Sequence, residues 1–288
     1  MMQTGWLIYS KKDAKENASF INWFIKEAQN QNINLHLVLR ENLEIGIIDN
    51  AHICHLNKRS IKLPDLAIIR TIEPLLNLHL ETLGVKVFNS SMVSRICNNK
   101  ALTHSMIHRL DIPMVDTLFL HGKNLTKHAP MNFPFVLKDA KSRGGAHVHL
   151  ITNPSEWHEK ITRYSYSNLI IQSSNVQYGK DLRVFVVGNK IIGAVLRESS
   201  TDFRANYKLG GSATWYELTH SEKETINKII NHFDFGMVGI DFLINLDGKL
   251  LFNEIEDVVG SRILSAVSNK NIIHEYITHI KKYSSQTL

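Results

Sequence analysis

The sequence predicts an α/β protein of more than one domain, and three observations support this. The chain has 288 residues, which is more than one average domain contains. Its 43% hydrophobic and 21% charged residues match globular proteins and exclude disordered and fibrous classes. Short apolar runs alternate with stretches of helical spacing, which is typical of parallel sheets with crossover helices.

Net charge and cysteine content limit the possible binding partners and exclude some classes of protein. The formal net charge is +6, and a basic balance attracts polyanions such as nucleic acids, membrane surfaces or phosphate-bearing small ligands. The basic residues are scattered, so we expect a solvated surface and no nucleic-acid partner. Cys54 and Cys97 lack CxxC partners, which excludes a disulfide framework and a cysteine zinc site. Because no apolar stretch is long enough to span a membrane, we expect a soluble, cytoplasmic protein.

The pattern of the first 90 residues predicts a small open α/β domain. Alternating apolar runs and amphipathic stretches give the order strand 6–9, helix 14–31, strand 35–39, strand 66–69, helix 74–83 and strand 85–88. Gly84 lies where the last of these helices should stop.

Residues 91–172 predict a second, central unit. A helix over 92–110 should end at the break Asp111-Ile112-Pro113. It is followed by strand 117–120, strand 135–139, strand 147–151, helix 153–164 and strand 169–172. The strands on either side of the glycine-bearing segment 141–146 read as a hairpin.

Residues 173–288 predict a third unit built on hairpins. Gly188-Asn189 should join the first pair of strands, and Asp247-Gly248 should join the second pair. The expected order is strand 181–187, strand 190–197, polar loop 199–212, helix 222–233, strand 238–244, strand 250–255 and helix 272–282.

The last predicted hairpin carries three acids that could act together. Period-two alternation places Asp241 on one strand, and Glu254 and Glu256 on one face of its neighbour. Oxygen ligands grouped in this way suit Mg²⁺. The alternative is a solvated face with three acids, but carboxylates in such an apolar neighbourhood are costly to bury without a cation.

A second signal is the lysine inside the apolar strand at 135–139. Lys138 is followed by a loop that contains Gly144 and Gly145, and such a loop can fold its backbone N–H groups over phosphate oxygens. The segment matches neither of the common glycine-rich phosphate motifs. Taken alone, it is equally consistent with an edge-strand lysine followed by a turn.

The order of these motifs along the chain resembles the ATP-grasp ligases, and most closely the RimK-type alpha-L-glutamate ligases. The residues that carry the resemblance are, in order, Lys100, Lys138 and its glycine loop, Gln172-Ser173, Asp181, Arg183, Arg204 to Asn206, Asp241, Glu254 and Glu256. The resemblance extends over nearly the whole chain, from the small domain before these motifs to the last hairpin. The resemblance implies an ATP-grasp fold with a pre-grasp α/β domain (1–90), a small central lid subdomain (91–172) and a C-terminal grasp subdomain (173–288).

The resemblance also implies a role for each matching residue. Cofactor-binding residues would be Lys100 and Lys138 on the ATP phosphates, Gly144 and Gly145 in the lid over them, Gln172 and Ser173 at the adenine, and Asp181 near the ribose. Catalytic residues would be Arg183 and Arg204, which neutralise the γ-phosphate and the acyl phosphate, with Asn206 beside them. Asp241, Glu254 and Glu256 would hold Mg²⁺, for which Mn²⁺ could substitute.

The implied reaction is ATP-dependent ligation of a carboxylate to an amine through an acyl phosphate. The substrates would be an amino acid, a peptide, or a protein or carrier-protein terminus, and a homo-oligomer is compatible with the family. In segment 257–262 the family's Pro-Gly turn beside the acceptor site is missing. The resemblance therefore does not identify the substrates. Two alternatives remain: a peptide-modifying ligase that macrocyclises or extends a natural product, and a non-catalytic ATP-binding module.

Overall fold

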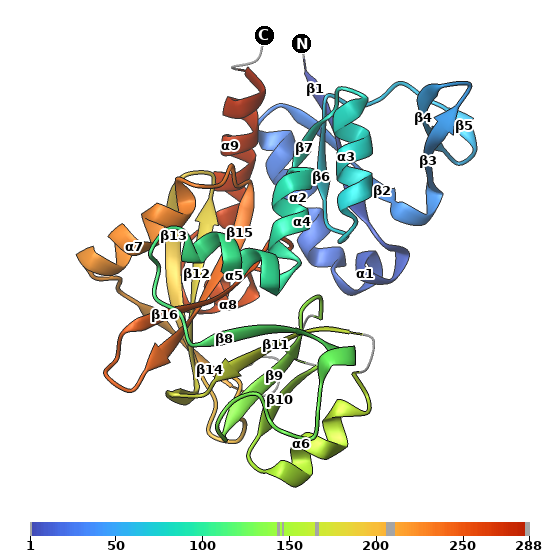
Figure 1. The fold of residues 1–288 in the computed structure, drawn as a ribbon. Helices are drawn as coiled ribbons and strands as arrows, with labels where there is room; N and C mark the ends of the chain where they lie inside the picture. The colour runs from blue at the N-terminus through green and yellow to red at the C-terminus, as the bar shows by residue number, and fades with distance from the viewer. Residues whose placement is uncertain (1, 143–144, 146, 165–166, 206–210, 286–288) are drawn as a thin grey trace.

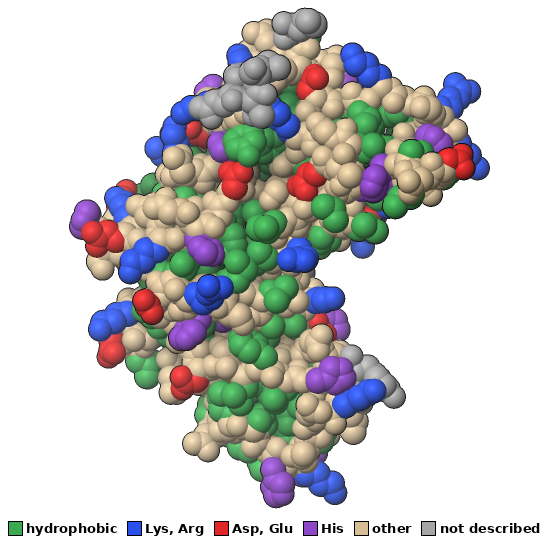
Figure 2. All heavy atoms as spheres, turned by 45° about the horizontal axis from the view of Figure 1, so that its top comes forward, with side chains coloured by type: hydrophobic (Ala, Val, Ile, Leu, Met, Phe, Trp, Pro, Cys, Tyr) green, Lys and Arg blue, Asp and Glu red, His purple; other side chains and the backbone are tan. Residues whose placement is uncertain are grey.

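The computed structural model describes residues 2–142, 145, 147–164, 167–205 and 211–285. Figure 1 shows an N-terminal domain and a C-terminal domain side by side, with a smaller lid below them. Seen as a surface in Figure 2, the molecule is notched between the N-terminal domain and the lid.

The N-terminal domain is an open parallel sheet with the strand order β2-β1-β6-β7. Its strands are β1 (Gln3–Tyr9), β2 (Ile33–Leu39), β6 (Leu66–Ile69) and β7 (Lys86–Phe88). Helices α1 (Lys11–Glu16), α2 (Ala18–Asn30) and α3 (Pro74–Thr82) connect them. The helix expected over 14–31 is therefore two helices, because Asn17 leaves the helical conformation and caps α1.

A small antiparallel sheet was not predicted from the sequence. It consists of β3 (Leu43–Ile48), β4 (Ala51–Leu56) and β5 (Arg59–Ser60), and it follows the short 3-10 turn η1 (Arg40–Asn42). Figure 1 shows it projecting from the N-terminal domain. Mixed burial along β3 and β4 gives the weak alternation that makes such a segment hard to recognise.

Helices α4 (Ser91–Cys97) and α5 (Lys100–His108) lead from the first domain to the lid. They replace the single helix expected over 92–110, because Asn99 caps the start of α5 through its side chain. Their apolar residues Val93, Cys97 and Ile107 join a core with the C-terminal sheet. The pair therefore fixes the base of the lid to the third unit.

The lid is a four-stranded sheet in the order β10-β9-β11-β8, covered by one helix. Its elements are β8 (Thr117–His121), the turn η2 (Gly122–Asn124), β9 (Phe135–Asp139), β10 (Val148–Ile151), α6 (Pro154–Ile161) and β11 (Asn168–Ser173). The expected hairpin of β9 and β10 is present and antiparallel. A separate core around Trp157 and Phe135 lies within the lid.

The C-terminal domain is a five-stranded sheet in the order β14-β13-β12-β15-β16. It contains β12 (Val176–Val187), β13 (Lys190–Glu198), β14 (Ser212–Tyr216), β15 (Met237–Asn245) and β16 (Leu250–Glu256), with α7 (His220–Ile230), α8 (Arg262–Val267) and α9 (Ile272–Ser285). Strand β14 and helix α8 were not expected from the sequence. One continuous core joins this sheet and α9 to the N-terminal sheet and α2.

Candidate active site

The acidic hairpin has the register that the alternation predicts. Asp241 of β15 pairs with Glu254 of β16, and Gly239 pairs with Glu256. A bulge follows Asp241, because Phe242 pairs with Phe252 and leaves Asn253 as the extra residue. Bulges re-aim side chains beside active sites, and here Asn253 and Glu254 each contact a lysine.

Asp241 lies at the centre of a buried ion-pair network. It accepts hydrogen bonds from Nε of Arg183 at 2.7 Å and from its second guanidinium nitrogen at 2.6 Å. Arg197 adds a third bond at 2.8 Å. Burial alone would raise the pKa of Asp241, but the two arginines outweigh it and lower the pKa to about 2. Asp241 is therefore ionised at neutral pH.

Asp181 and Glu256 complete this network. Both oxygens of Asp181 accept hydrogen bonds from Arg197, and Arg183 also contacts Glu256 at 2.9 Å. Burial raises the pKa of Asp181 to about 6, although Arg197 acts in the opposite direction. The oxygens of Asp181 are thus engaged by Arg197, and its expected place near a ribose stays a prediction.

Arg197 is a site residue that the sequence reasoning missed. It lies directly opposite Asp181 in the register of β12 and β13. The sequence contained a signal for this pairing, because both strands and the turn between them were predicted. Counting back from the Gly188-Asn189 turn brings this acid and this base near one another, although a bulge after Phe185 shifts the register.

Lys100 and Lys138 approach the hairpin from two other elements. Lys100 begins α5, and its Nζ lies 3.3 Å from Glu254 while also donating to the carbonyl of Ser142. Lys138 of β9 donates to the side-chain oxygen of Asn253 at 2.9 Å. Burial lowers the pKa of Lys138 to about 8. The structure thus brings both predicted lysines to the acidic hairpin.

His104 of α5 packs against β16, the second strand of the acidic hairpin. Its Nε2 lies 2.8 Å from the backbone carbonyl oxygen of Asn253, and its ring packs edge-on against Phe252. Burial lowers the pKa of His104 to about 4. The ring is therefore neutral at physiological pH and donates from Nε2, which holds the bulge in place.

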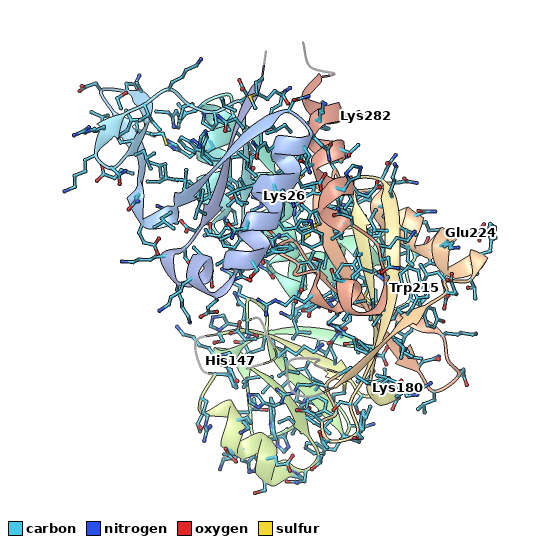
Figure 3. The ribbon with its side chains drawn as sticks, turned by 180° about the vertical axis from the view of Figure 1, so that it is seen from behind. Lys26, His147, Lys180, Trp215, Glu224 and Lys282 are labelled. Atoms are coloured by element: carbon cyan, nitrogen blue, oxygen red, sulfur yellow. The ribbon has the colours of Figure 1, made fainter. Side chains whose placement is uncertain are left out.

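The glycine loop meets the loop that precedes β14. A guanidinium nitrogen of Arg204 donates to the carbonyl of Gly145 at 2.6 Å, and Asp202 binds the same guanidinium. His147, labelled in Figure 3, lies at the edge of the lid that faces the N-terminal domain. Gly144 and Asn206 lie outside the described residues. Arg204 is thus placed to fasten one loop to the other.

The predicted adenine hinge lies at the end of the lid sheet. Gln172 is buried and donates to the hydroxyl of Thr117 at 3.1 Å, while the N–H of Ser173 donates to the carbonyl of Asp116. Directly after them the chain crosses into β12. These residues form the connection between the lid and the C-terminal domain, and their contact with adenine stays a prediction.

The donor chemistry of the hairpin suits magnesium in part. Glu254 and Glu256 line a small pocket with Lys100 and Ser142, and their side chains are 28% and 25% exposed. Asp241 is different, because the two arginines occupy its oxygens. Within the described residues, no group of three or more His, Cys, Asp or Glu side chains is arranged to hold a metal ion. Two of the three predicted ligands therefore fit Mg²⁺ as the site stands.

Comparisons with known proteins show which family and which solved structures this chain is similar to. Residues 97–280 match the RimK-like ATP-grasp domain. The glutamate–LysW ligase ArgX of Sulfurisphaera tokodaii is 28% identical over 235 residues, which cover 77% of this chain and 83% of that relative. None of the helices among the described residues has the length and apolar character needed to cross a membrane.

Solved structures with the same fold cover almost the whole chain. The RimK domain ATP-grasp protein of Sphaerobacter thermophilus has a TM-score of 0.73 at 16% identity and covers 96% of this chain and 99% of its own. The ATP-grasp ligase PsnB, solved with Mg, ADP and a phosphomimetic variant of its minimal precursor, has a TM-score of 0.70 at 14% identity and covers 99% of both chains.

Proposed function

Because the chain belongs to the RimK-like ATP-grasp family, we propose that it is a carboxylate–amine ligase that uses ATP and Mg²⁺ to form an amide bond. One observation carries the proposal. Two lysines from separate elements, Lys100 and Lys138, converge on the acidic hairpin of β15 and β16. A polyanion such as a triphosphate matches this combination of cations and oxygen ligands.

The chain's residues would act mainly by binding and positioning. A substrate carboxylate attacks the γ-phosphorus of ATP and releases ADP, and an uncharged amine then displaces phosphate from the acyl phosphate to give the amide. Lys100 and Lys138 would bind the phosphate oxygens, and Arg204 would hold the glycine loop over them. Glu254 and Glu256 would hold Mg²⁺, which when bound neutralises phosphate charge.

Arg183 and Arg197 hold the buried carboxylates of this site in fixed positions. Their guanidinium groups fix Asp241 and Asp181 in a charge-balanced network, so the hairpin meets its ligand in one geometry. Such preorganisation is what makes electrostatic stabilisation effective in a dry site. Arg183 also contacts Glu256, so all three of its guanidinium nitrogens are paired with carboxylates, and its contact with the γ-phosphate stays a prediction.

We propose an amino acid as one substrate and either an amino acid or a peptide as the other. The relative ArgX is named as a glutamate–LysW ligase, and PsnB was solved with the precursor peptide PsnA2. Both substrate classes are thus found on this fold. A cytoplasmic location belongs to the same proposal, because Cys54 and Cys97 are both free and buried, as in reducing compartments.

The test is ADP release with Mg-ATP and pairwise pools of the twenty amino acids, with product masses read in parallel. We expect release with at least one pair, and a product whose mass is the sum of the two minus water. Lys138→Ala should abolish release while the chain stays folded by circular dichroism, although losing the buried bond to Asn253 should lower the melting temperature. Lys26→Ala, on the exposed face of α2 (Figure 3), is the matched control and should behave as wild type.

Peptide acceptors form a second arm of this test. Activity with a short peptide pool and none with free amino acids would favour the peptide-modifying alternative. Tight ATP binding without ADP release in any pool would favour a non-catalytic binding module and would contradict the proposed ligase.

A further inference from the structure

The carboxyl edge of the N-terminal sheet has the geometry of a ligand site. Strand β1 connects to β2 on one side and is flanked by β6 on the other. The chain order thus reverses between β1 and β6, and open parallel sheets bind ligands at the carboxyl ends of their strands at such a point. Tyr9 ends β1, and Arg70 and Thr71 directly follow β6. The N–H of Arg70 donates to the carbonyl of Ile8, which holds Arg70 beside Tyr9.

Four polar atoms at this edge are buried without a hydrogen-bond partner among the described residues. They are the hydroxyl oxygens of Tyr9, Thr71 and Ser261, and Nε of Arg70. Each residue is more than nine-tenths buried, with exposures of 3%, 8%, 1% and 8% in the order named. Buried polar groups are nearly always paired, so several unpaired ones in one place indicate a missing partner.

The segment after β16 closes this edge from the C-terminal side. The carbonyl of Val259 accepts a hydrogen bond from Arg70 at 2.7 Å, and Ser261 lies two residues further on. Burial raises the pKa of Tyr276 on α9 well above its usual range, and Arg70, Asp257 and Tyr9 are close enough to influence it. The four atoms thus lie on segments that meet at one junction between the two domains.

The positive charge of Arg70 indicates which chemical class of ligand would fit this junction. The guanidinium of Arg70 lies over the ring of Phe20, 5.6 Å from its centroid. Within the part of the chain that the structure describes, no ion pair involves Arg70, whereas Arg183 and Arg197 each have carboxylate partners. An arginine fork together with three hydroxyl donors suits a carboxylate, which accepts several hydrogen bonds in one plane.

We propose that Arg70, Thr71, Tyr9 and Ser261 bind a non-reacting carboxylate of an amino-acid substrate. This inference rests on the proposed ligase function. A carboxylate held by Arg70 is separate from the one that is phosphorylated, because the latter must reach the γ-phosphate at Lys100 and Lys138. The four atoms are enclosed in the structure, so segment 257–261 has to part from the sheet edge to admit the ligand.

The first test measures binding without nucleotide. The melting temperature of the wild-type chain is recorded with each of the twenty amino acids and with the corresponding α-carboxamides. We expect at least one free amino acid to raise the melting temperature while its carboxamide does not. Arg70→Met should lose this shift, and Arg95→Met, on the exposed side of α4, should keep it. If no amino acid shifts the wild type, or if Arg70→Met retains the shift, the proposal is wrong.

The second test separates binding from a structural role. Thr71→Val removes a buried hydroxyl that has no partner among the residues described by the structure, so the melting temperature should not fall. The KM for the amino acid should nevertheless rise by about tenfold, as expected for losing a hydrogen bond to a charged group. Arg70→Lys keeps the charge but loses the fork, and it should raise the same KM. An unchanged KM in Thr71→Val and Arg70→Lys would overturn the proposal.

Replacing each member of an active pair by its α-carboxamide identifies the source of the carboxylate. Loss of product with the amine substrate's carboxamide places its carboxylate at Arg70, and loss with the acyl donor's carboxamide places the donor's there. If the wild type ligates no pair at all, the ligase proposal fails, and the melting shifts alone decide the role of Arg70.

Discussion

The charge of Lys138 depends on its burial in the fold. Burial lowers its pKa to about 8, so the side chain is charged below that pH and becomes neutral above it. Phosphate oxygens favour the charged form. ATP binding near pH 8 should therefore take up a proton, and the Kd for ATP should rise by up to about tenfold per pH unit above about 8.

Calorimetric titration of ATP at pH 7, 8 and 9, in buffers of different ionisation enthalpy, checks this expectation. Lys138→Arg provides the matched variant, because arginine stays charged throughout the range, and its Kd should be nearly flat. A wild-type Kd that does not change between pH 7 and 9 would show that another group controls ATP binding.

The ion-pair network of Arg183, Arg197, Asp181 and Asp241 joins three neighbouring strands, β12, β13 and β15. Removing one partner of a buried ion pair leaves an uncompensated charge and typically costs about 3–5 kcal/mol. Arg197→Met should lower the free energy of unfolding by about this amount, measured by urea denaturation. The double variant Arg197→Met with Asp181→Leu should recover part of the loss. A larger loss in the double variant would contradict the assigned pairing.

At the level of elements, the sequence predicted most strands because apolar periodicity is local. It also placed Asp241, Glu254 and Glu256 on one face, since alternation alone determines facing. The arginines bound to Asp241 could not be assigned in this way. Their contacts depend on how β12 pairs with both β13 and β15, including a bulge, and cross-strand register is a tertiary property. The partners of Tyr9 and Ser261 depend similarly on the docking of two domains.

At the scale of the whole molecule, Asn89 joins the N-terminal domain to the C-terminal domain. Its buried amide donates to the carbonyls of Met237 and Asp257 and accepts from the N–H of Gly236. Asn89→Ala would remove a buried hydrogen bond from each of these three backbone groups, at about 1–3 kcal/mol each. We expect a loss of at least about 3 kcal/mol in the free energy of unfolding by urea. Asn98→Ala, whose amide bonds stay within its own helix turn, should cost less.

The lid should unfold locally without the rest, because in the described part of the chain its core shares no residue with the cores of the two larger domains. Trp157 is fully buried there, packs against Phe135 and donates to the carbonyl of Thr126. Trp157→Ala should cost about 3–5 kcal/mol within the lid. Hydrogen exchange followed by mass spectrometry should then accelerate in β8 to β11 and stay unchanged in β12 and β15. Phe235→Ala, in the C-terminal core, should give the opposite pattern. Acceleration throughout the chain in Trp157→Ala would show that the lid and the two larger domains form one cooperative unit.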